Sequence, residues 1–298
     1  MYAIETRDLV KEFNGLRAVD SLSFTVERGE IFGLLGPNGA GKTTTIRMLL
    51  DIFKPDAGEI KVLGGTVDTH TKSRIGYLPE ERGLYPRLRV VQCLTYLARL
   101  KGIGRREAKS RAEALLERVG LAEWRRKRVK ELSKGMQQKV QFVATIVHDP
   151  DLLILDEPFQ GLDPINVDLL KEMIRELHQT GKTIIFSTHI MDQVEQMCDR
   201  ILLINEGQAV LYGLLAEIKS RYAQHAVLLR SDDSLEGLEG VLRIEKQGTD
   251  HLVFLRADTS PQDILRQLVA RKATITRFEV ATPSLEEIFI TAVKEGAR

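Results

Sequence analysis

A glycine-rich segment, GPNGAGKT at 36–43, carries the residue types that bind phosphate. It matches the pattern GxxxxGK[ST] between the apolar run IFGLL, which is typical of a strand, and a helical segment. Gly39 and Gly41 let the backbone curl so that its N–H groups face phosphate oxygens. The ammonium group of Lys42 neutralises the outer phosphates, and the hydroxyl of Thr43 can bind Mg²⁺. A plain glycine turn is the weaker alternative, because this pattern in this context is rare by chance. The predicted phosphate-binding residues are Gly36, Pro37, Asn38, Gly39, Ala40, Gly41, Lys42, Thr43 and Thr44.

Two carboxylates, Asp156 and Glu157, follow the apolar residues of the segment DLLILDEPF. At the end of a buried strand, Asp156 can reach a metal and Glu157 can reach an attacking water. Taken alone, such a pair is as often just a strand leaving the core. Together with the phosphate-binding segment, the pair predicts half of a hydrolase site.

A histidine, His189, stands at the end of the run TIIFSTH. Its imidazole is expected to project into the same crevice and to hydrogen-bond a terminal phosphate. A lone strand-end histidine is more often structural. Its shared position with two other strand-end motifs favours the functional interpretation.

The segment LSKGMQQKV, at 132–140, places Ser133 and Gly135 before a polar amphipathic run. A hydroxyl, a glycine that permits close approach and a helix N-terminus together favour an anion. Without the other motifs, a serine that only caps the helix would be the preferred interpretation.

Short apolar segments such as IFGLLG, DLLILDE and TIIFSTH predict strands buried on both faces, separated by helical patterns. The expected fold is an α/β core with a mainly parallel sheet, whose ligand site lies at the C-terminal ends of the strands. A helical pattern between Thr95 and Arg118 predicts an inserted helical subdomain at about 88–150. A hairpin over RILLINEGQAVLYG closes this domain, 1–213, and 214–298 reads as a small α+β domain without a chemical motif.

The composition, 43% hydrophobic and 29% charged over 298 residues, is globular and allows one large domain plus a smaller one. No apolar run approaches the ~18 to 20 residues of a membrane span, and the acidic N-terminus is unlike a signal peptide, so a cytosolic chain is expected. Cys93 and Cys198 lack the spacing of a disulfide framework or zinc site.

Residues 99–139 form a basic segment, with fourteen Lys or Arg against five Glu. A nucleic-acid patch at WRRKRVK is the alternative to a solvated face, which we favour because no RNA- or DNA-binding motif accompanies it.

The order of these motifs over about 1–213 resembles the ATP-binding subunits of ABC transporters. The resemblance covers GPNGAGKTT, YLPE where the family's glutamine loop falls, LSKGMQQKV where its LSGGQ signature falls, LLILDEP, GLDP and STH. It implies a P-loop NTPase core of the ABC type with an antiparallel β portion, and ATP and Mg²⁺ as cofactors. It also implies that Phe13 stacks on adenine, that Glu80 joins Thr43 and Asp156 at the metal, and that Asp163 communicates between paired subunits.

In that family two subunits face head to tail, so the resemblance assigns Ser133 and Gly135 to the γ-phosphate on a partner subunit. It implies a homodimer bound to a separate integral membrane permease, peripheral to the cytoplasmic face of the membrane. The segments YLPEERGLYP, LSKGMQQK and PSLEEIF resemble bacterial sodium-efflux and drug-efflux ATPases, which carry a similar C-terminal extension.

Three positions depart from the family pattern. Lys134 replaces the signature's first glycine and Met136 its glutamine, which removes one flexible position and one amide group. Glu80 replaces the glutamine of the glutamine loop; it offers an oxygen to Mg²⁺ but no amide. These changes predict altered turnover.

The predicted function is an ATP-hydrolysing motor subunit of an exporter-type ABC transporter, with no nucleic-acid partner. A soluble ABC ATPase of translation or DNA repair is the alternative. Translation types usually carry two cassettes and repair types a long coiled coil, whereas this chain has one GxxxxGK[ST] pattern and no sustained heptads. A small-molecule kinase would leave the signature and GLDP unexplained. The cargo is not predicted, because cargo contacts belong to the permease.

Overall fold

The computed structural model describes residues 1–81, 83–222, 226–231, 233–235, 237–256, 258–281 and 283–296. The chain divides into two compact units, Met1–Leu215 and Ala216–Lys294, and the last described residues, Glu295 and Gly296, group with the first. The first unit contains all the motifs for which the sequence predicts a chemical role, and the segment PSLEEIF lies in the second.

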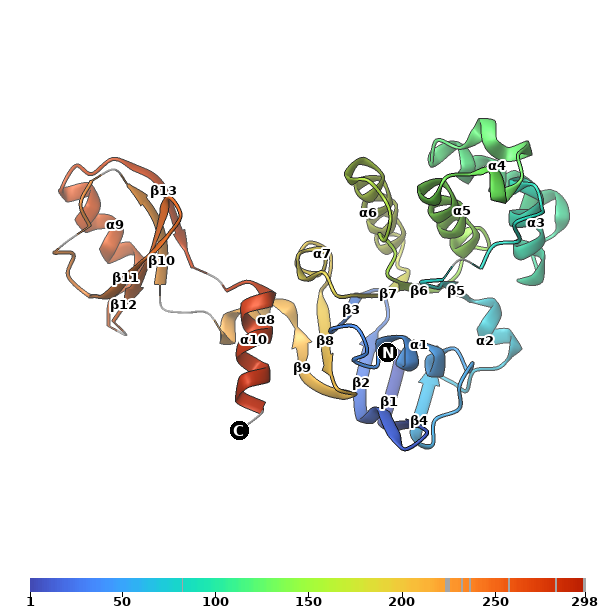
Figure 1. The fold of residues 1–298 in the computed structure, drawn as a ribbon, viewed down its shortest axis with the longest axis horizontal. Helices are drawn as coiled ribbons and strands as arrows, with labels where there is room; N and C mark the ends of the chain where they lie inside the picture. Colours follow the sequence, from blue (N-terminus) through green and yellow to red (C-terminus); the bar gives the residue numbers. More distant parts are fainter. Residues whose placement is uncertain are drawn as a thin grey trace. The chain divides into compact units, whose positions relative to one another are not determined.

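A six-stranded sheet forms the centre of the first unit (Figure 1). Five neighbouring strands are parallel, and the edge strand β9 runs antiparallel to β8. Every residue of β3, β6 and β7 is buried, which is why their sequences are continuous apolar runs. The strands, in spatial order, are β5 (Ile75–Leu78), β6 (Leu152–Asp156), β7 (Thr183–Thr188), β3 (Ile31–Leu35), β8 (Arg200–Asn205) and β9 (Gln208–Leu214).

A second, antiparallel sheet of three strands has the order β2-β1-β4. Its strands are β1 (Tyr2–Phe13), β2 (Leu16–Glu27) and β4 (Ala57–Val62). The helix α1 (Lys42–Leu49) buries Ile46, Met48 and Leu49 in one core with residues of both sheets. Phe24 and Phe32 stack across this core with ring centroids 5.6 Å apart. The prediction of a mainly parallel sheet with an antiparallel portion is confirmed.

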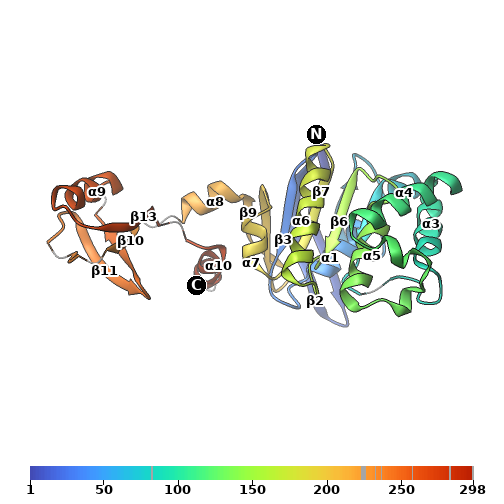
Figure 2. The ribbon, with the colours of Figure 1, turned by 90° about the horizontal axis from the view of Figure 1, so that it is seen from above.

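Helices α3 (Val90–Leu100), α4 (Arg105–Arg118) and α5 (Lys134–Ile146) form the insertion between β5 and β6. Short 3-10 turns at Ala122–Arg126 and Val129–Glu131 connect α4 to α5. The remaining helices of this unit are α2 (Thr69–Ser73), α6 (Pro164–Gln179) and α7 (Met191–Glu195). In both ribbon views α6 lies over the central sheet, where it contacts β7 (Figure 2).

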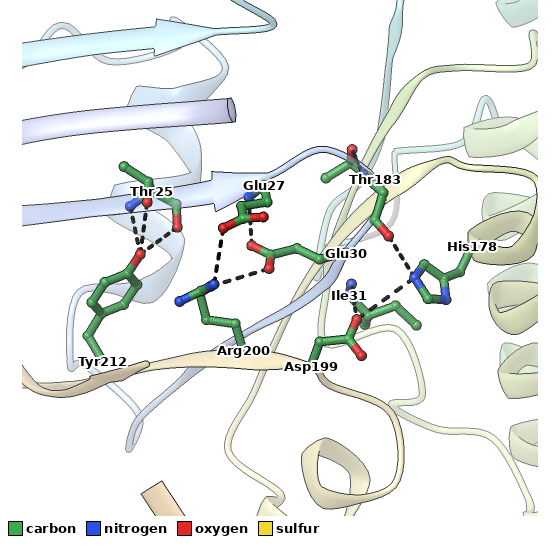
Figure 3. Close-up of polar contacts among 10 residues, drawn as sticks. Thr25, Glu27, Glu30, Ile31, His178, Thr183, Asp199, Arg200 and Tyr212 are labelled. Carbon is green, nitrogen blue, oxygen red and sulfur yellow. Dashed lines mark hydrogen bonds and ion pairs between the residues drawn. The ribbon is translucent and has the colours of Figure 1, made fainter. Parts of the chain in front are cut away.

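An ionic network ties the antiparallel sheet to the central one (Figure 3). The carboxylate of Glu30 accepts a hydrogen bond from the Glu27 N–H at 2.7 Å, and Arg200 pairs with both glutamates at 3.3 Å. Burial raises the pKa of Glu30. The Tyr212 hydroxyl donates to the Thr25 carbonyl at 2.9 Å. These contacts join β2 to β8 and β9.

The start of β3 is fixed by a second group of hydrogen bonds in the same view (Figure 3). The Gly29 N–H donates to the Thr183 hydroxyl at 2.9 Å, and His178 Nε2 donates to the Gly29 carbonyl at 2.7 Å. The Ile31 N–H donates to the Asp199 carboxylate at 2.9 Å. Because β3 runs directly into the glycine-rich segment, this anchoring positions the predicted phosphate-binding loop.

The second unit contains a four-stranded antiparallel sheet of order β11-β12-β10-β13. Ile264 and Leu268 of α9 pack on this sheet against residues such as Val227 and Val253. Its elements, with the linking and terminal helices, are α8 (Leu215–Arg221), β10 (Ala226–Ser231), β11 (Val241–Gln247), β12 (Asp250–Leu255), α9 (Pro261–Ala270), β13 (Ile275–Val280) and α10 (Leu285–Gly296).

His148 is buried just after α5. Its Nε2 atom lies 3.1 Å from the Ile75 carbonyl, to which Lys101 Nζ also donates at 3.0 Å. Its Nδ1 atom has no hydrogen-bond partner within the described residues. Burial, followed by the charge of Lys101, lowers the pKa of His148 to about 4. The imidazole is therefore neutral in the folded chain under mildly acidic conditions.

We expect acid to destabilise the first unit through His148. The unfolded chain binds a proton near the ordinary histidine pKa of about 6.5, whereas the folded chain does so only near 4, so stability falls as pH decreases between these values. From about pH 7 to about pH 5 the loss is about 2 kcal/mol. Urea unfolding followed by fluorescence of Trp124, the only tryptophan, measures it. The His148→Gln variant should no longer show this loss of unfolding free energy at low pH. The control His70→Gln, a change at an exposed site, should still show it. If both variants have the same pH dependence, His148 is not its source.

Candidate nucleotide site

A cavity of about 290 Å³ opens where β3 turns into α1. Residues from three separate motifs line it, together with one residue of β2. They are Ala18, Asn38, Gly39, Ala40, Gly41, Lys42, Thr43, Thr44, Glu80, Asp156 and Glu157. The cavity lies at the C-terminal ends of parallel strands, where the sequence pattern places a ligand.

Two glycines of the loop are required by close backbone contacts. Gly36 has φ +150°, and a Cβ atom there would lie 2.2 Å from the Ile204 carbonyl oxygen. Gly41 has φ +107°, and its Cβ would lie 2.3 Å from the Ala18 oxygen. Among the residues that the structure describes, no side chain caps the helix α1, which begins at the next residue. Its first N–H groups and its dipole are thus directed at the cavity, which suits an anion.

Lys42 is buried, yet its ammonium group is held within the loop. Nζ donates to the Gly36 carbonyl at 2.7 Å and to the Pro37 carbonyl at 3.1 Å. Burial lowers the pKa of Lys42, while the charges of Glu157, then Asp156 and Glu80, act in the opposite direction. This cation is placed to meet phosphate oxygens entering the cavity.

Asp156 ends β6 and is only 1% exposed. Its Oδ1 accepts a hydrogen bond from the Ser187 hydroxyl, and Thr43 lines the same cavity. Oδ2 is buried without a hydrogen-bond partner in the described chain. Burial raises the pKa of Asp156. An unpartnered buried carboxylate oxygen beside a threonine hydroxyl fits a hard divalent cation such as Mg²⁺.

Glu157 and His189 form a hydrogen-bonded pair at the ends of neighbouring strands. Nδ1 of His189 lies 2.8 Å from Oε1 of Glu157, and the Thr188 hydroxyl donates to Oε2 at 3.2 Å. Glu157 has a φ of +47°, an unusual value for a non-glycine residue. The backbone is bent where the carboxylate turns into the cavity. A carboxylate so placed can accept a proton from a water that attacks a phosphoryl group.

The hydroxyls of Ser187 and Thr188 hydrogen-bond the carboxylates of Asp156 and Glu157, and the sequence alone did not predict this role. Both are fully buried. The parallel register sets Asp156 opposite Ser187, so the end of β7 supports the end of β6. The available signal was the change from apolar to hydroxyl side chains within TIIFSTH.

The signature residues lie outside this cavity. Ser133 caps α5 by accepting a hydrogen bond from the Met136 N–H at 3.3 Å, and a Cβ on Gly135 would lie 3.6 Å from the Gly161 oxygen. Asp163 caps α6 by accepting from the Asn166 N–H at 3.0 Å. None of the three predicted residues lines the cavity of its own chain.

Phe13, the predicted adenine contact, is also outside the set of lining residues. Its ring is 40% exposed at the end of β1. The ring meets Phe53 edge to face, with centroids 5.5 Å apart, and Lys11 Nζ lies 5.4 Å from its centroid. Phe13 therefore remains partly accessible to solvent.

Comparison with known proteins gives matches along both units. Residues 19–160 match the ABC transporter family, and 213–293 match the C-terminal domain of DrrA1-3-like ATP-binding proteins. The uncharacterized ABC transporter ATP-binding protein YhaQ of Bacillus subtilis is 44% identical over 96% of both chains. This chain belongs to the ABC transporter ATP-binding family.

Two further comparisons extend this assignment. The daunorubicin/doxorubicin resistance ATP-binding protein DrrA of Streptomyces peucetius is 35% identical, over 97% of this chain and 91% of its own. A solved structure of the ATP-binding subunit of an ABC transporter superposes with a TM-score of 0.70 at 32% identity, covering 74% of this chain and 93% of that one.

Family membership confirms the predicted fold class and the predicted ATPase activity. The chain is an ATP-hydrolysing motor subunit of an ABC transporter, and the translation or repair alternative finds no support. Subunits of this family dimerise and work with membrane permeases. Within the part of the chain that the structure describes, no helix is both long and apolar enough to cross a bilayer.

Proposed function

We propose that this ABC ATPase drives an exporter, as a homodimer bound to a separate integral membrane permease at the cytoplasmic face of the membrane. The observation that carries this proposal is the match of 213–293 to a DrrA-type C-terminal domain, together with full-length similarity to a drug-resistance ATP-binding protein. The class of cargo is set by the permease, because the permease makes the contacts with the cargo.

We propose two domains with different roles. Residues 1–213 bind and hydrolyse ATP, with the helical subdomain at about 88–150, and 214–298 form an accessory domain. The compact units and the separate family matches support this division. All cavity-lining residues fall in the first domain, which supports assigning the chemistry to it.

Within one chain, the loop 36–44 binds the phosphates of ATP and Phe13 stacks on the adenine. Thr43, Asp156 and Glu80 would hold Mg²⁺, which supplies positive charge to the phosphate oxygens when bound. Support comes from the unpartnered Oδ2 of Asp156 and from the oxygen donors that line the cavity. Glu157 orients and deprotonates the attacking water, and His189 hydrogen-bonds the γ-phosphate.

The signature completes the site of a partner subunit. Ser133 and Gly135 then bind the γ-phosphate held by the partner's loop, and Asp163 lies at the subunit contact. Three observations support this trans arrangement: Ser133 is exposed, it caps a 13-residue helix, and it lies outside its own chain's cavity. A helix N-terminus presented at the surface provides N–H groups and a dipole for an anion.

The permease contacts an aromatic surface of the insertion, in this proposal. Tyr85 and Tyr96 are 45% and 43% exposed, and their rings meet edge to face at 5.5 Å. Leu100, 63% exposed, lies one turn beyond Tyr96 on α3. The basic side chains of Arg87 and Arg89 are exposed nearby in sequence. Exposed aromatic side chains flanked by arginine are typical of protein interfaces.

Capture from native membranes tests this function. The tagged chain should retain a multi-spanning permease, identified by mass spectrometry, and the captured complex should hydrolyse ATP. Replacing both Tyr85 and Tyr96 with alanine should reduce capture at least about tenfold, because buried tyrosines dominate interface energy. Tyr2→Ala, which removes a tyrosine of similar exposure on β1, is the matched control.

Two results would count against the proposal in different ways. Unchanged capture by the double variant would refute the docking surface. Absence of any permease on the wild-type chain, under conditions in which the chain hydrolyses ATP, would refute the proposed assembly.

A further inference from the structure

We infer that Glu80 makes nucleotide binding depend on a divalent cation, because its carboxylate repels ATP that carries no metal. This inference rests on the proposed function, since it concerns ATP and Mg²⁺ in the same cavity. It concerns how the site distinguishes metal-free ATP from ATP·Mg²⁺, and not the hydrolysis step.

The cavity carries an excess of negative charge. Its lining contains three carboxylates and one ammonium group, that of Lys42. That ammonium donates to backbone carbonyls and makes no ion pair with a carboxylate among the described residues. Glu157 is hydrogen-bonded to His189, and Asp156 accepts a hydrogen bond from the Ser187 hydroxyl. Glu80 has no ion-pair partner in the described part of the chain; it lines the same cavity as Lys42, and its charge raises the pKa of Lys42.

The position of Glu80 follows from the sheet. It stands two residues beyond the end of β5, which runs parallel to β6, and Leu78 is paired with Leu155. The carboxylates of Glu80 and Asp156 are therefore brought to the same edge of the sheet. The charges of Glu157, Asp156 and Glu80 each raise the pKa of Lys42, against the larger effect of burial.

Metal-free ATP is a polyanion, and its outer phosphates have to enter this cavity to reach Lys42. Each uncompensated carboxylate there repels it, and the low dielectric of a partly enclosed site strengthens the repulsion. A divalent cation bound to the phosphates reduces that repulsion. A glutamine at this position would offer an oxygen without a charge, so it would distinguish the two forms of ATP less strongly.

The protein side chains do not form a complete metal site by themselves. Among the described residues, no group of three or more His, Cys, Asp or Glu side chains is arranged to hold a metal ion. Mg²⁺ commonly binds through one or two carboxylates together with substrate phosphates and water, so phosphate oxygens would supply further ligands here. Cation and nucleotide are expected to bind together.

The test compares ATP affinity with Mg²⁺ and with a chelator, by titration calorimetry on wild-type and Glu80→Gln chains. Glu80→Gln should bind metal-free ATP about tenfold more tightly than wild type does, equivalent to about 1.4 kcal/mol, with no gain in affinity for ATP·Mg²⁺. Because the effect is electrostatic, it should shrink as salt is added. Glu81→Gln removes a charge from the adjacent exposed residue, which does not line the cavity, and should behave as wild type.

Each other outcome has a definite meaning. Equal affinity of wild type and Glu80→Gln for metal-free ATP would overturn the inference. Weaker binding of ATP·Mg²⁺ with no change for metal-free ATP would overturn it too, because Glu80 would then act only as a ligand. Failure of the wild type to bind ATP even with Mg²⁺ would instead refute the nucleotide site itself.

Discussion

Glu157→Gln is expected to lower ATP turnover at least about a hundredfold while ATP remains bound. The amide has the shape of the carboxylate but cannot accept the proton of the attacking water. Glu157 is 8% exposed and contacts His189 and the Thr188 hydroxyl. Glutamine can keep both contacts, because its amide group retains one acceptor oxygen and gains a donor. The variant should therefore fold and bind nucleotide normally.

The measurement combines steady-state hydrolysis with light scattering. With ATP and Mg²⁺, unhydrolysed nucleotide should hold two Glu157→Gln chains together, so the mass should double relative to the nucleotide-free chain. Glu172→Gln, an exposed change on α6, serves as the charge-matched control and should turn over normally. A Glu157→Gln chain that hydrolyses ATP at the wild-type rate would remove Glu157 from the role of base.

Ser133→Arg is expected to block hydrolysis, again by about a hundredfold or more, with ATP affinity of the isolated chain nearly unchanged. The reason is that Ser133 caps α5 outside its own cavity, so the added bulk and charge fall on the proposed contact with a partner's nucleotide. Calorimetry on dilute, monomeric chains measures the affinity. Loss of ATP binding by such monomers would contradict the trans assignment.

Mixing two inactive variants provides a sharper test of the trans site. A Lys42→Ala chain lacks the phosphate-binding ammonium, and a Ser133→Arg chain lacks the signature contact. Their heterodimer contains one site with both defects and one site built entirely from intact halves. Partial hydrolysis should return on mixing, whereas neither variant alone should recover. Recovery of activity by Ser133→Arg alone would contradict the proposed role of this serine.

Several features of the fold were predictable because their physical causes are local. Strands buried on both faces of a parallel sheet have to be continuous apolar runs, and β3, β6 and β7 have that pattern. The hairpin of β8 and β9 was likewise predictable, because apolar and polar residues alternate on both sides of Glu206 and Gly207. Both residues adopt positive φ in the turn. Local sequence thus predicted the class of sheet and its antiparallel edge.

The spatial order of the strands was not predictable in this way. The order β5-β6-β7-β3-β8-β9 places β3 between strands that follow it by about 150 residues in the chain. The paired strands share one buried core with α1 and the antiparallel sheet, and its members include Ile4, Leu9 and Ile46. Periodicity in a single segment does not carry that information.

The sequence by itself predicted the glycine-rich loop 36–44 as the phosphate site, because the backbone and charge requirements of such a loop are contained within a few consecutive residues. It also determined that Asp156, Glu157 and His189 end buried strands. Only the tertiary structure decided that the Ser187 and Thr188 hydroxyls hold those carboxylates, and that Glu80 faces the same cavity as Lys42. These contacts join positions far apart in the chain, and their distances are set by the register of neighbouring parallel strands.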